Sequence, residues 1–228
     1  MFEEKLKSKK NEVYKREREL DGKTRYVVDK EFTETKRFYI EYMIHDILAK
    51  EGLSVPRLLD FEAPSGDFKG KLIYEFIDGD VVLDLLQVES VAEEAVRQIV
   101  CWMARYYSVT AERSEGEHWV LGDAHLRNFI YVRENGVLYG FDFEEAEKGS
   151  AEQDVAKMFM YIATYEPAYS MRHMEIAELF LRESLSAFEI EKGRLVDEVY
   201  SESKRMEARR SQEVDSELLV SVIESVFV

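Results

Sequence analysis

The chain has 228 residues, of which 46% are hydrophobic and 34% charged, and its formal net charge is −16. This length is enough for one or two domains with a sizeable core, and the hydrophobic content excludes a disordered chain. The strongly negative charge argues against nonspecific coating of nucleic acid. One cysteine and four scattered histidines exclude a disulfide framework and a zinc site.

The sequence patterns indicate a soluble protein. Charges interrupt every apolar stretch well before the ~18 residues that a membrane span needs. Residues 1–17 are charged throughout, unlike the apolar core of a signal peptide. Cys101 lies in an apolar-periodic run and is expected to be a small buried side chain. We therefore expect a cytoplasmic location.

The first third of the chain predicts short strands and one helix. Strands are expected over 11–20 and 24–32, because an Asp-Gly turn separates them. Residues 33–52 place apolar side chains at helical spacing and end in a glycine, as helices often do. Two more strands are expected over 55–64 and 71–79.

After Gly79 the pattern becomes mainly helical. A long amphipathic helix is expected from Ser90 onward, followed by a hairpin around the Asn-Gly turn at 135–136. Everything beyond Ser150 reads as helix. The predicted fold class is therefore α+β with two lobes: a strand-rich lobe with one helix over 1–77, and a helical lobe with one hairpin over 78–228.

Three polar residues flank the second predicted hairpin. In the stretch LGDAHLRNFIYV, Asp123 and Asn128 come just before its first strand, and Asp142 follows its second strand. Antiparallel pairing brings Asn128 and Asp142 side by side at the open end. Two oxygen donors at that separation suit Mg²⁺, which takes its other ligands from water and phosphate. A turn rich in Asp and Asn is the simpler alternative.

The order Gly-Asp-x-His-x-x-Asn, hairpin, Asp-Phe-Glu resembles the catalytic segment of the protein-kinase-like superfamily. It is most similar to the variant found in aminoglycoside phosphotransferases and choline kinases. The resemblance implies a bilobal fold that uses ATP and Mg²⁺. It further implies Asp123 as the residue that orients and deprotonates an acceptor hydroxyl, and Asn128 and Asp142 as metal ligands. Asp154 resembles the acid that braces the catalytic loop; the alternative is an acid favoured at a helix start by the helix dipole.

The resemblance implies matching parts in the first lobe. Lys30 resembles the strand lysine that pairs the α- and β-phosphates. Glu41 on the following helix resembles its ion-pair partner, with Glu34 as the competing partner. The stretch LIYEFIDG resembles the interlobe hinge, which implies that the backbone of Glu75 and Ile77 hydrogen-bonds adenine. The alternative for Lys30 is an ordinary solvated lysine, and the alternative for LIYEFIDG is a plain strand end.

The first lobe also departs from the usual pattern. The stretch LKSKKNEVYKRE stands in the place of a glycine-rich loop, yet contains no glycine. Its Ser-x-x-Asn-x-Val-Tyr pattern resembles the phosphate loop of aminoglycoside and choline kinases, which implies Ser8 and Asn11 as phosphate-covering residues. Lys9 and Lys10 are either further phosphate contacts or part of a solvated turn.

Three positions near the catalytic segment leave alternatives open. Leu121 stands where the related kinases usually have a histidine. Glu144, in DFE instead of DFG, is either an additional metal ligand or an exposed acid. His125 either supports the loop and touches phosphate, or is an ordinary packed histidine.

The phosphate acceptor is predicted from the compact layout. Only one long helix is expected between the hinge and Asp123, where aminoglycoside and choline kinases insert further helices around a small acceptor. This compactness resembles RIO and Bud-type atypical kinases, lipopolysaccharide-core sugar kinases and small archaeal RNA kinases. It favours a macromolecular acceptor, a protein serine or threonine or an RNA ribose, over a small molecule such as a sugar, choline or an aminoglycoside. A nucleotide-binding pseudokinase scaffold is a third possibility.

Docking surfaces for a phosphate backbone are limited to two regions of the sequence. One is the first 37 residues, which carry more basic than acidic side chains. The other is the cluster Lys204, Arg205, Arg209 and Arg210. Both also read as mixed-charge faces of ordinary strands and helices.

Overall fold

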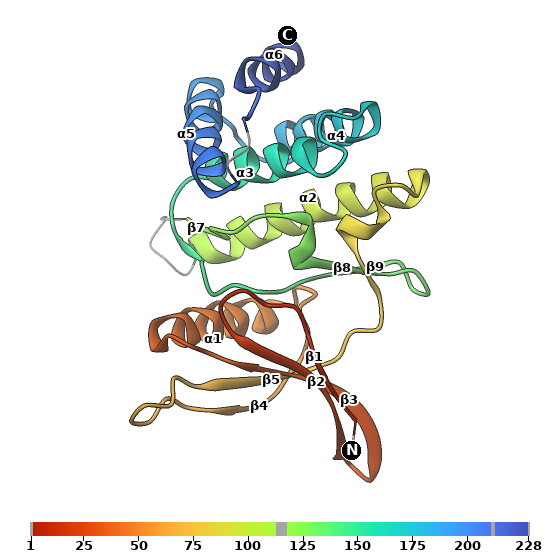
Figure 1. Cartoon of the computed structure of the whole chain (residues 1–228), viewed down its shortest axis with the longest axis vertical. Coiled ribbons are helices and arrows are strands. Elements are labelled where there is room, and N and C mark those ends of the chain that lie inside the picture. Colours follow the sequence, from red (N-terminus) through yellow and green to blue (C-terminus); the bar gives the residue numbers. More distant parts are fainter. Residues whose placement is uncertain (1, 113–117, 211–212, 228) are drawn as a thin grey trace.

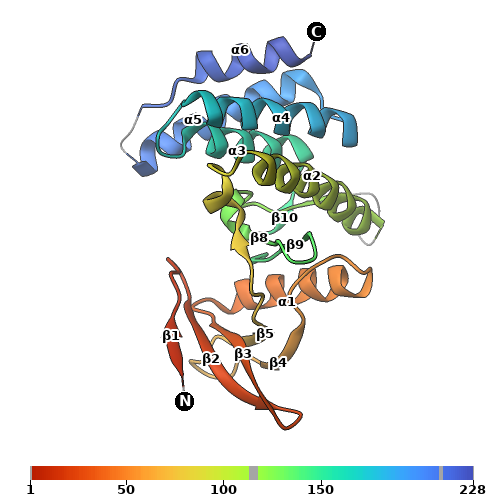
Figure 2. The ribbon, with the colours of Figure 1, turned by 90° about the vertical axis from the view of Figure 1, so that its right-hand side faces the viewer.

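The computed structural model describes residues 2–112, 118–210 and 213–227. A strand-rich half and a helical half follow one another along the chain and along the long axis of the molecule (Figures 1 and 2). The predicted α+β, bilobal fold is therefore confirmed. Among the described helices, none combines the length and the apolar character that crossing a membrane requires.

The strand-rich lobe is one five-stranded antiparallel sheet in the order β1-β2-β3-β5-β4. Its strands are β1 (Glu3–Lys5), β2 (Glu12–Leu20), β3 (Lys23–Glu31), β4 (Leu58–Glu62) and β5 (Lys71–Glu75). Asp21 and Gly22 connect β2 to β3 with positive φ angles of 53° and 71°, the conformation that a two-residue hairpin turn requires. The short edge strand β1 was not predicted, because its three residues are all charged and show no alternation of apolar and polar side chains.

Helix α1 (Thr35–Lys50) lies between this sheet and the helical lobe (Figure 1). It packs on the sheet through Phe38, which joins a small cluster with Phe32 and Leu72. The buried face of α1 also carries polar side chains, Glu41 and His45. A core-facing carboxylate needs polar partners, and those partners form the site described below.

The helical lobe also holds two small sheets, ordered β6-β8-β9 and β10-β7. Its strands are β6 (Asp80–Val81), β7 (Trp119–Val120), β8 (Phe129–Val132), β9 (Val137–Gly140) and β10 (Glu147–Lys148). Its helices are the 3-10 turns η1 (Val82–Leu85) and η2 (Leu126–Asn128), and α2 (Glu89–Glu112), α3 (Ala151–Thr164), α4 (Met171–Ala187), α5 (Lys192–Arg210) and α6 (Ser216–Val226).

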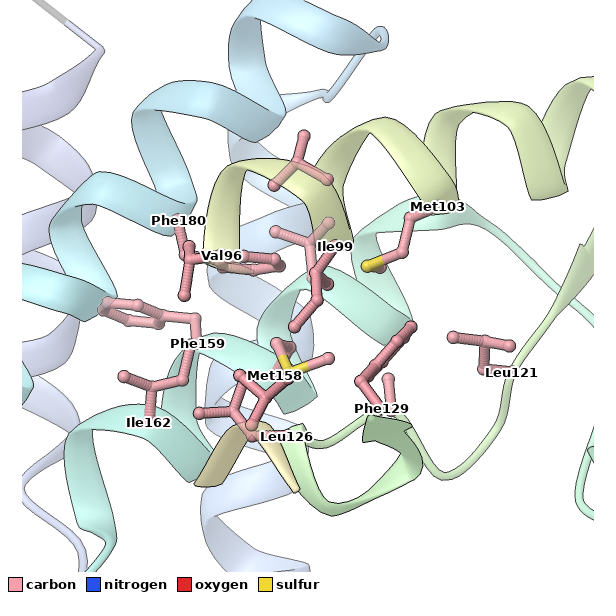
Figure 3. Packing of buried hydrophobic residues seen from close by; sticks show 14 of the residues in the cluster. Val96, Ile99, Met103, Leu121, Leu126, Phe129, Met158, Phe159, Ile162 and Phe180 are labelled. Carbon is pink, nitrogen blue, oxygen red and sulfur yellow. The ribbon is translucent and has the colours of Figure 1, made fainter. Parts of the chain in front are cut away.

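The main hydrophobic core lies in the helical lobe. Figure 3 shows Leu121, Leu126 and Phe129 among side chains of α2, α3 and α4. These three residues are at most 6% exposed, and burying each one stabilises the fold by about 1.5–3 kcal/mol. Buried side chains therefore anchor the loop to the core both before and after Asp123. Cys101, expected to be buried, is exposed, because it lies on the solvent face of α2 beside the buried Trp102 and Met103.

The connection after α1 joins the two lobes. The carbonyl oxygen of Ser54 accepts hydrogen bonds from the Gly140 amide at 3.1 Å and from Trp102 Nε1 at 3.0 Å. Gly140 ends β9 and Trp102 lies on α2, so one carbonyl of the strand-rich lobe holds two elements of the helical lobe. This contact places α1 next to the segment that follows β9.

Candidate active site

Lys30 on β3 and Glu41 on α1 form a buried ion pair, with 3.1 Å between Nζ and Oε2. The Tyr74 hydroxyl donates to the other oxygen of Glu41 at 3.1 Å. Glu34, the competing partner, instead contacts Arg37 at 3.0 Å. Burial raises the pKa of Glu41 and outweighs the opposing effect of Lys30. Burial alone would lower the pKa of Lys30, but the surrounding carboxylates raise it above its ordinary value, so Lys30 is charged.

The segment after β9 brings two more carboxylates to Lys30. Lys30 Nζ lies 2.5 Å from Asp142 Oδ1 and 3.1 Å from Glu144 Oε2. Between them, the Phe143 amide donates to Glu41 at 2.8 Å, and its ring is buried in the core. Glu144 is 5% exposed, so the expectation of an exposed acid was wrong. We call Lys30, Glu41, Asp142 and Glu144 the Lys30 cluster.

The Lys30 cluster contains the donor set for a hard cation. Glu41, Asp142 and Glu144 each have an oxygen within 4.8 Å of the others. Glu41 is committed to Lys30, to the Tyr74 hydroxyl and to the Phe143 amide. Asp142 is partly exposed and has a φ of 68°, a conformation that Asp tolerates better than most residues. Glu144 is likewise held by Lys30, Arg37 and the Asn11 side-chain amide. Asp142 is therefore the carboxylate that best fits Mg²⁺, which binds one or two carboxylates in addition to water and phosphate.

Asp123 and Asn128 lie on the 121–128 loop, which precedes β8. The Asn128 side-chain amide donates to the Asp123 carbonyl oxygen at 2.9 Å, so Oδ1 is the atom that Asn128 offers to a cation. The Phe141 amide donates to the Asn128 carbonyl at 3.1 Å. The hairpin therefore sets Asn128 beside the residue that precedes Asp142.

Asp154 on α3 holds the start of this loop. Its carboxylate accepts hydrogen bonds from the Leu121 amide at 2.6 Å, the Gly122 amide at 3.1 Å and the Tyr107 hydroxyl at 3.1 Å. Burial raises the pKa of Asp154 to about 6, although these hydrogen bonds act in the opposite direction. One buried side chain thus orients two consecutive backbone amides.

The 121–128 loop rests directly on the 141–146 segment. Gly122 has a φ of 71°, and a Cβ atom there would lie 2.0 Å from the carbonyl oxygen of Glu145. Only glycine fits this conformation and this close approach together. The contact fixes the distance between the loop that carries Asp123 and the segment that carries Asp142.

The Asp123 carboxylate is partly exposed and lies among cations. Burial raises its pKa, but His125, Lys157 and Lys10 lower it by more, so the pKa of Asp123 falls below its ordinary value. His125 Nε2 lies 3.5 Å from Asp123 Oδ2, and its ring packs edge-on against Tyr161. Asp123 is therefore ionised at neutral pH and can accept a hydrogen bond.

Residues of the 6–11 loop, between β1 and β2, contact the same segment. Asn11 is buried; its side-chain amide binds Glu144, and its Oδ1 accepts from the Thr33 amide at 3.3 Å. Ser8 Oγ accepts from the Asn11 amide at 3.2 Å. These bonds make Asn11 a bridge between the lobes, while the predicted phosphate roles of Ser8 and Asn11 stay predictions.

The predicted hinge follows β5. The Glu75 amide donates to the Arg57 carbonyl at 2.9 Å, so Glu75 retains only its carbonyl for another partner. Ile77 lies in the connection between β5 and β6. Beside it, the Lys15 ammonium lies over the Phe76 ring, 3.7 Å from its centroid.

Four contacting residues were missed by sequence reasoning. Arg37 lies one turn before Glu41 on α1, and Lys157, which donates to the Gly122 carbonyl, lies three residues after Asp154. Helical spacing from a predicted site residue would have found both. Tyr74 and Tyr107 gave no local signal, because they meet Glu41 and Asp154 only in the folded chain.

No protein-family model matches the sequence, and no curated protein does either. Solved structures match along most of the chain. A thermostable mutant of aminoglycoside phosphotransferase APH(4)-Ia superimposes with a TM-score of 0.55 and 15% identity, over 99% of this chain and 94% of that one.

A second enzyme gives the same result. Aminoglycoside phosphotransferase APH(3'')-Id from Streptomyces rimosus, in complex with ADP and streptomycin, gives a TM-score of 0.57 at 12% identity, over 82% of this chain and 91% of that one. Another structure of that enzyme gives 0.53 at 13% identity with the same coverage. At such identities the likeness establishes the fold. The chain therefore has the bilobal, protein-kinase-like fold of the aminoglycoside phosphotransferases.

Proposed function

We propose that this protein is an ATP-dependent phosphotransferase that moves the γ-phosphate to a hydroxyl group of a small molecule. One observation carries the proposal: Lys30 of β3 and Glu41 of α1 meet Asp142 of the helical lobe. The 121–128 loop, with Asp123 and Asn128, is bonded to the residue that precedes Asp142. A structural protein has no use for a buried ammonium among three carboxylates beside an ionised, partly exposed aspartate. The shared fold with aminoglycoside phosphotransferases supports the same conclusion.

In this proposal the strand-rich lobe binds the nucleotide. Lys30 pairs the α- and β-phosphates, and Glu41 holds the lysine in place. The Glu75 carbonyl and the Ile77 backbone receive the adenine edge. The similar APH(3'')-Id structure is a complex with ADP, which supports nucleotide binding by this fold.

Asn128 and Asp142 would hold Mg²⁺, with Glu144 as an additional carboxylate. A bound Mg²⁺ would neutralise the charge that develops on the transferred phosphoryl group. Asn128 is suited to this role because its amide nitrogen is already tied to the Asp123 carbonyl.

Asp123 would act on the acceptor. Its ionised carboxylate accepts a hydrogen bond from the acceptor hydroxyl and aligns the oxygen with the γ-phosphorus. A bond forms between that oxygen and the phosphorus, the bond from phosphorus to the ADP oxygen breaks, and the proton passes to Asp123. Positioning supplies most of the catalysis, which explains why the 121–128 loop is braced so firmly by Asp154.

The acceptor is better explained as a small molecule than as the macromolecule that the compact sequence favoured. Both related enzymes are aminoglycoside phosphotransferases, and one was solved with streptomycin. The basic cluster near the end of α5 offers little to RNA, because Arg205 and Arg209 both bind the buried carboxylate of Glu202. The side chain of Arg210 lies outside the described residues.

The test is phosphate transfer from γ-labelled ATP to separated small-molecule, protein and RNA fractions, with Asp67→Asn, an exposed loop variant, as control. We expect label in the small-molecule fraction with the native enzyme and the control. Asp123→Asn should lower transfer by about 10³-fold while keeping Mg–ATP binding. Asp142→Ala should lose Mg-dependent binding.

Label in the protein or RNA fraction would restore the macromolecular acceptor. Nucleotide binding without label in any fraction would favour a pseudokinase scaffold. Equal transfer by Asp123→Asn and the native enzyme would show that the site is assigned wrongly.

A further inference from the structure

The carboxylate of Glu145 forms ion pairs with two cations of the strand-rich lobe. Lys10 reaches it from the 6–11 loop and Arg37 reaches it from α1. The three side chains are 45%, 20% and 30% exposed for Lys10, Arg37 and Glu145. Arg37 also lies 3.4 Å from Glu144. Two cations from two elements thus meet one partly exposed acid across the gap between the lobes.

This group lies at the phosphate end of the proposed site. Glu145 follows Glu144 of the Lys30 cluster, and its backbone touches Gly122, the neighbour of Asp123. The charge of Lys10 reaches Asp123, since it contributes to lowering the pKa of that carboxyl. The γ-phosphate in the proposed reaction has to lie between Asp123 and the Lys30 cluster, next to these cations.

The 6–11 loop has no glycine, so its backbone cannot wrap closely around phosphates as a glycine-rich loop does. Side-chain cations are the remaining means of covering a highly charged triphosphate. A carboxylate and a phosphate present similar acceptor oxygens to arginine and lysine. A terminal phosphate can therefore take the place of Glu145 as their partner.

We propose that Lys10 and Arg37 bind the terminal phosphate of ATP and that Glu145 competes with this phosphate for them. The proposal rests on the function proposed above. It makes Lys10 and Arg37 specificity-determining residues that favour ATP over ADP. Glu145 then weakens nucleotide binding by holding the two cations.

The loop is built so that Lys10 can change partner without moving its backbone. The Thr33 hydroxyl donates to the Lys10 carbonyl at 2.9 Å, and Ser8 accepts from the Asn11 amide. These bonds hold the backbone of the loop independently of the Lys10 ammonium, which contacts Glu145. Partly exposed ion pairs contribute little to stability, so exchanging Glu145 for a phosphate costs little.

The experiment is isothermal titration calorimetry of ATP and ADP, each with Mg²⁺, on single variants of the full chain. Lys10→Met and Arg37→Met should weaken ATP binding about three- to tenfold and ADP binding by much less. Glu145→Gln should tighten ATP binding about two- to fivefold. The matched controls are Lys7→Met, an exposed lysine on the same loop, and Glu147→Gln, an exposed acid two residues after Glu145 on β10; both should leave the dissociation constants unchanged.

Circular dichroism melting curves of each variant establish that it is folded before titration. An unchanged ratio of ATP to ADP affinity in both Lys10→Met and Arg37→Met would overturn the proposal. Weaker ATP binding by Glu145→Gln would also overturn it, since Glu145 would then support the two cations or assist nucleotide binding instead of competing with it. Lys30→Met separates the two proposals: if it weakens both nucleotides while Lys10→Met and Arg37→Met change neither, the proposed function stands and this inference fails.

Discussion

The Lys30 cluster and the 121–128 loop carry the residues of the proposed site, but the two regions are held in opposite ways. In the Lys30 cluster, three carboxylates surround one ammonium, and these three ion pairs run from side chain to side chain. At the start of the 121–128 loop, a single carboxylate, that of Asp154, fixes two backbone amides. In the Lys30 cluster, the loss of one carboxylate leaves two others paired with the ammonium. In the 121–128 loop, the loss of Asp154 leaves both amides without this acceptor.

This difference fits the proposed chemistry. Groups that bind a nucleotide and a cation have to exchange partners when these ligands arrive, and a cluster with surplus carboxylates allows such exchange. An aspartate that aligns a hydroxyl has to stay in place, because small displacements of reacting groups cost rate steeply. Substitution of Asp154 or Gly122 should therefore lower the free energy of unfolding more than substitution of any one acid of the Lys30 cluster.

The largest expected effect is that of Asp154→Ala. It leaves two amides and the buried Tyr107 hydroxyl without their acceptor, which should lower the free energy of unfolding by about 3–5 kcal/mol. Urea denaturation followed by circular dichroism measures the loss. Glu134→Ala, on an exposed turn, should stay within about 0.5 kcal/mol of the native protein. A loss below about 1 kcal/mol for Asp154→Ala would show that the loop has other supports.

The second effect is the pH dependence that Asp154 confers. Its pKa is about 6 in the folded protein and near 3.8 in the unfolded chain, so the folded state binds more protons between these values. The contribution of Asp154 to stability is therefore greatest below pH 4, falls as the pH rises to 6, and is constant above that.

The measurement compares the native protein with Asp154→Asn, whose amide does not titrate. The difference between their unfolding free energies should fall by about 2–3 kcal/mol from pH 4 to pH 7. A difference that stays constant, or that grows with pH, would mean that burial does not dominate at Asp154.

Gly122→Ala should have a smaller effect, about 2 kcal/mol on the free energy of unfolding, from its positive φ and from the contact with the Glu145 carbonyl. Gly22→Ala is the matched control, since it has the same φ of 71° with nothing within 4 Å of the added Cβ. The control isolates the cost of the backbone conformation. Equal losses in the two variants would show that the close approach of loop and segment is not important.

The sequence was informative wherever a signal is local. The hairpins at Asp21-Gly22 and Asn135-Gly136, and the helical run after Ser150, follow from turn chemistry and periodicity. Asp123, Asn128 and Asp142 were found because a short hairpin brings them together. Their roles are still predictions; the structure shows Asn128 bonded to the Asp123 carbonyl and to the amide of the residue before Asp142.

Long-range contacts were beyond the sequence. Glu144 reads as an exposed acid in a run of acids, yet it is buried because Lys30 and Asn11 reach it from more than 100 residues away. Cys101 reads as buried because apolar residues adjoin it on α2, and only the packing of the helix decides which of them face solvent. Burial of a polar group depends on partners that a local pattern does not contain.

The smallest expected effect, below about 1 kcal/mol on the free energy of unfolding, is that of Glu41→Gln. Lys30 keeps Asp142 and Glu144, the glutamine still accepts from the Phe143 amide, and the raised pKa of Glu41 means that its surroundings already disfavour the charged form. Lys30→Met is the contrasting variant and should cost more, because it leaves three carboxylates without their shared cation.

Urea denaturation of both variants beside Asp154→Ala decides whether the two halves of the site really differ. If Glu41→Gln costs as much as Asp154→Ala, the Lys30 cluster is not redundant, and the Lys30–Glu41 pair holds α1 to the sheet. If it costs little while Lys30→Met costs several times more, α1 is held by the apolar contacts of Phe38 with Phe32 and Leu72. The carboxylates around Lys30 then remain available for exchange with a nucleotide and a cation, as the proposed reaction requires.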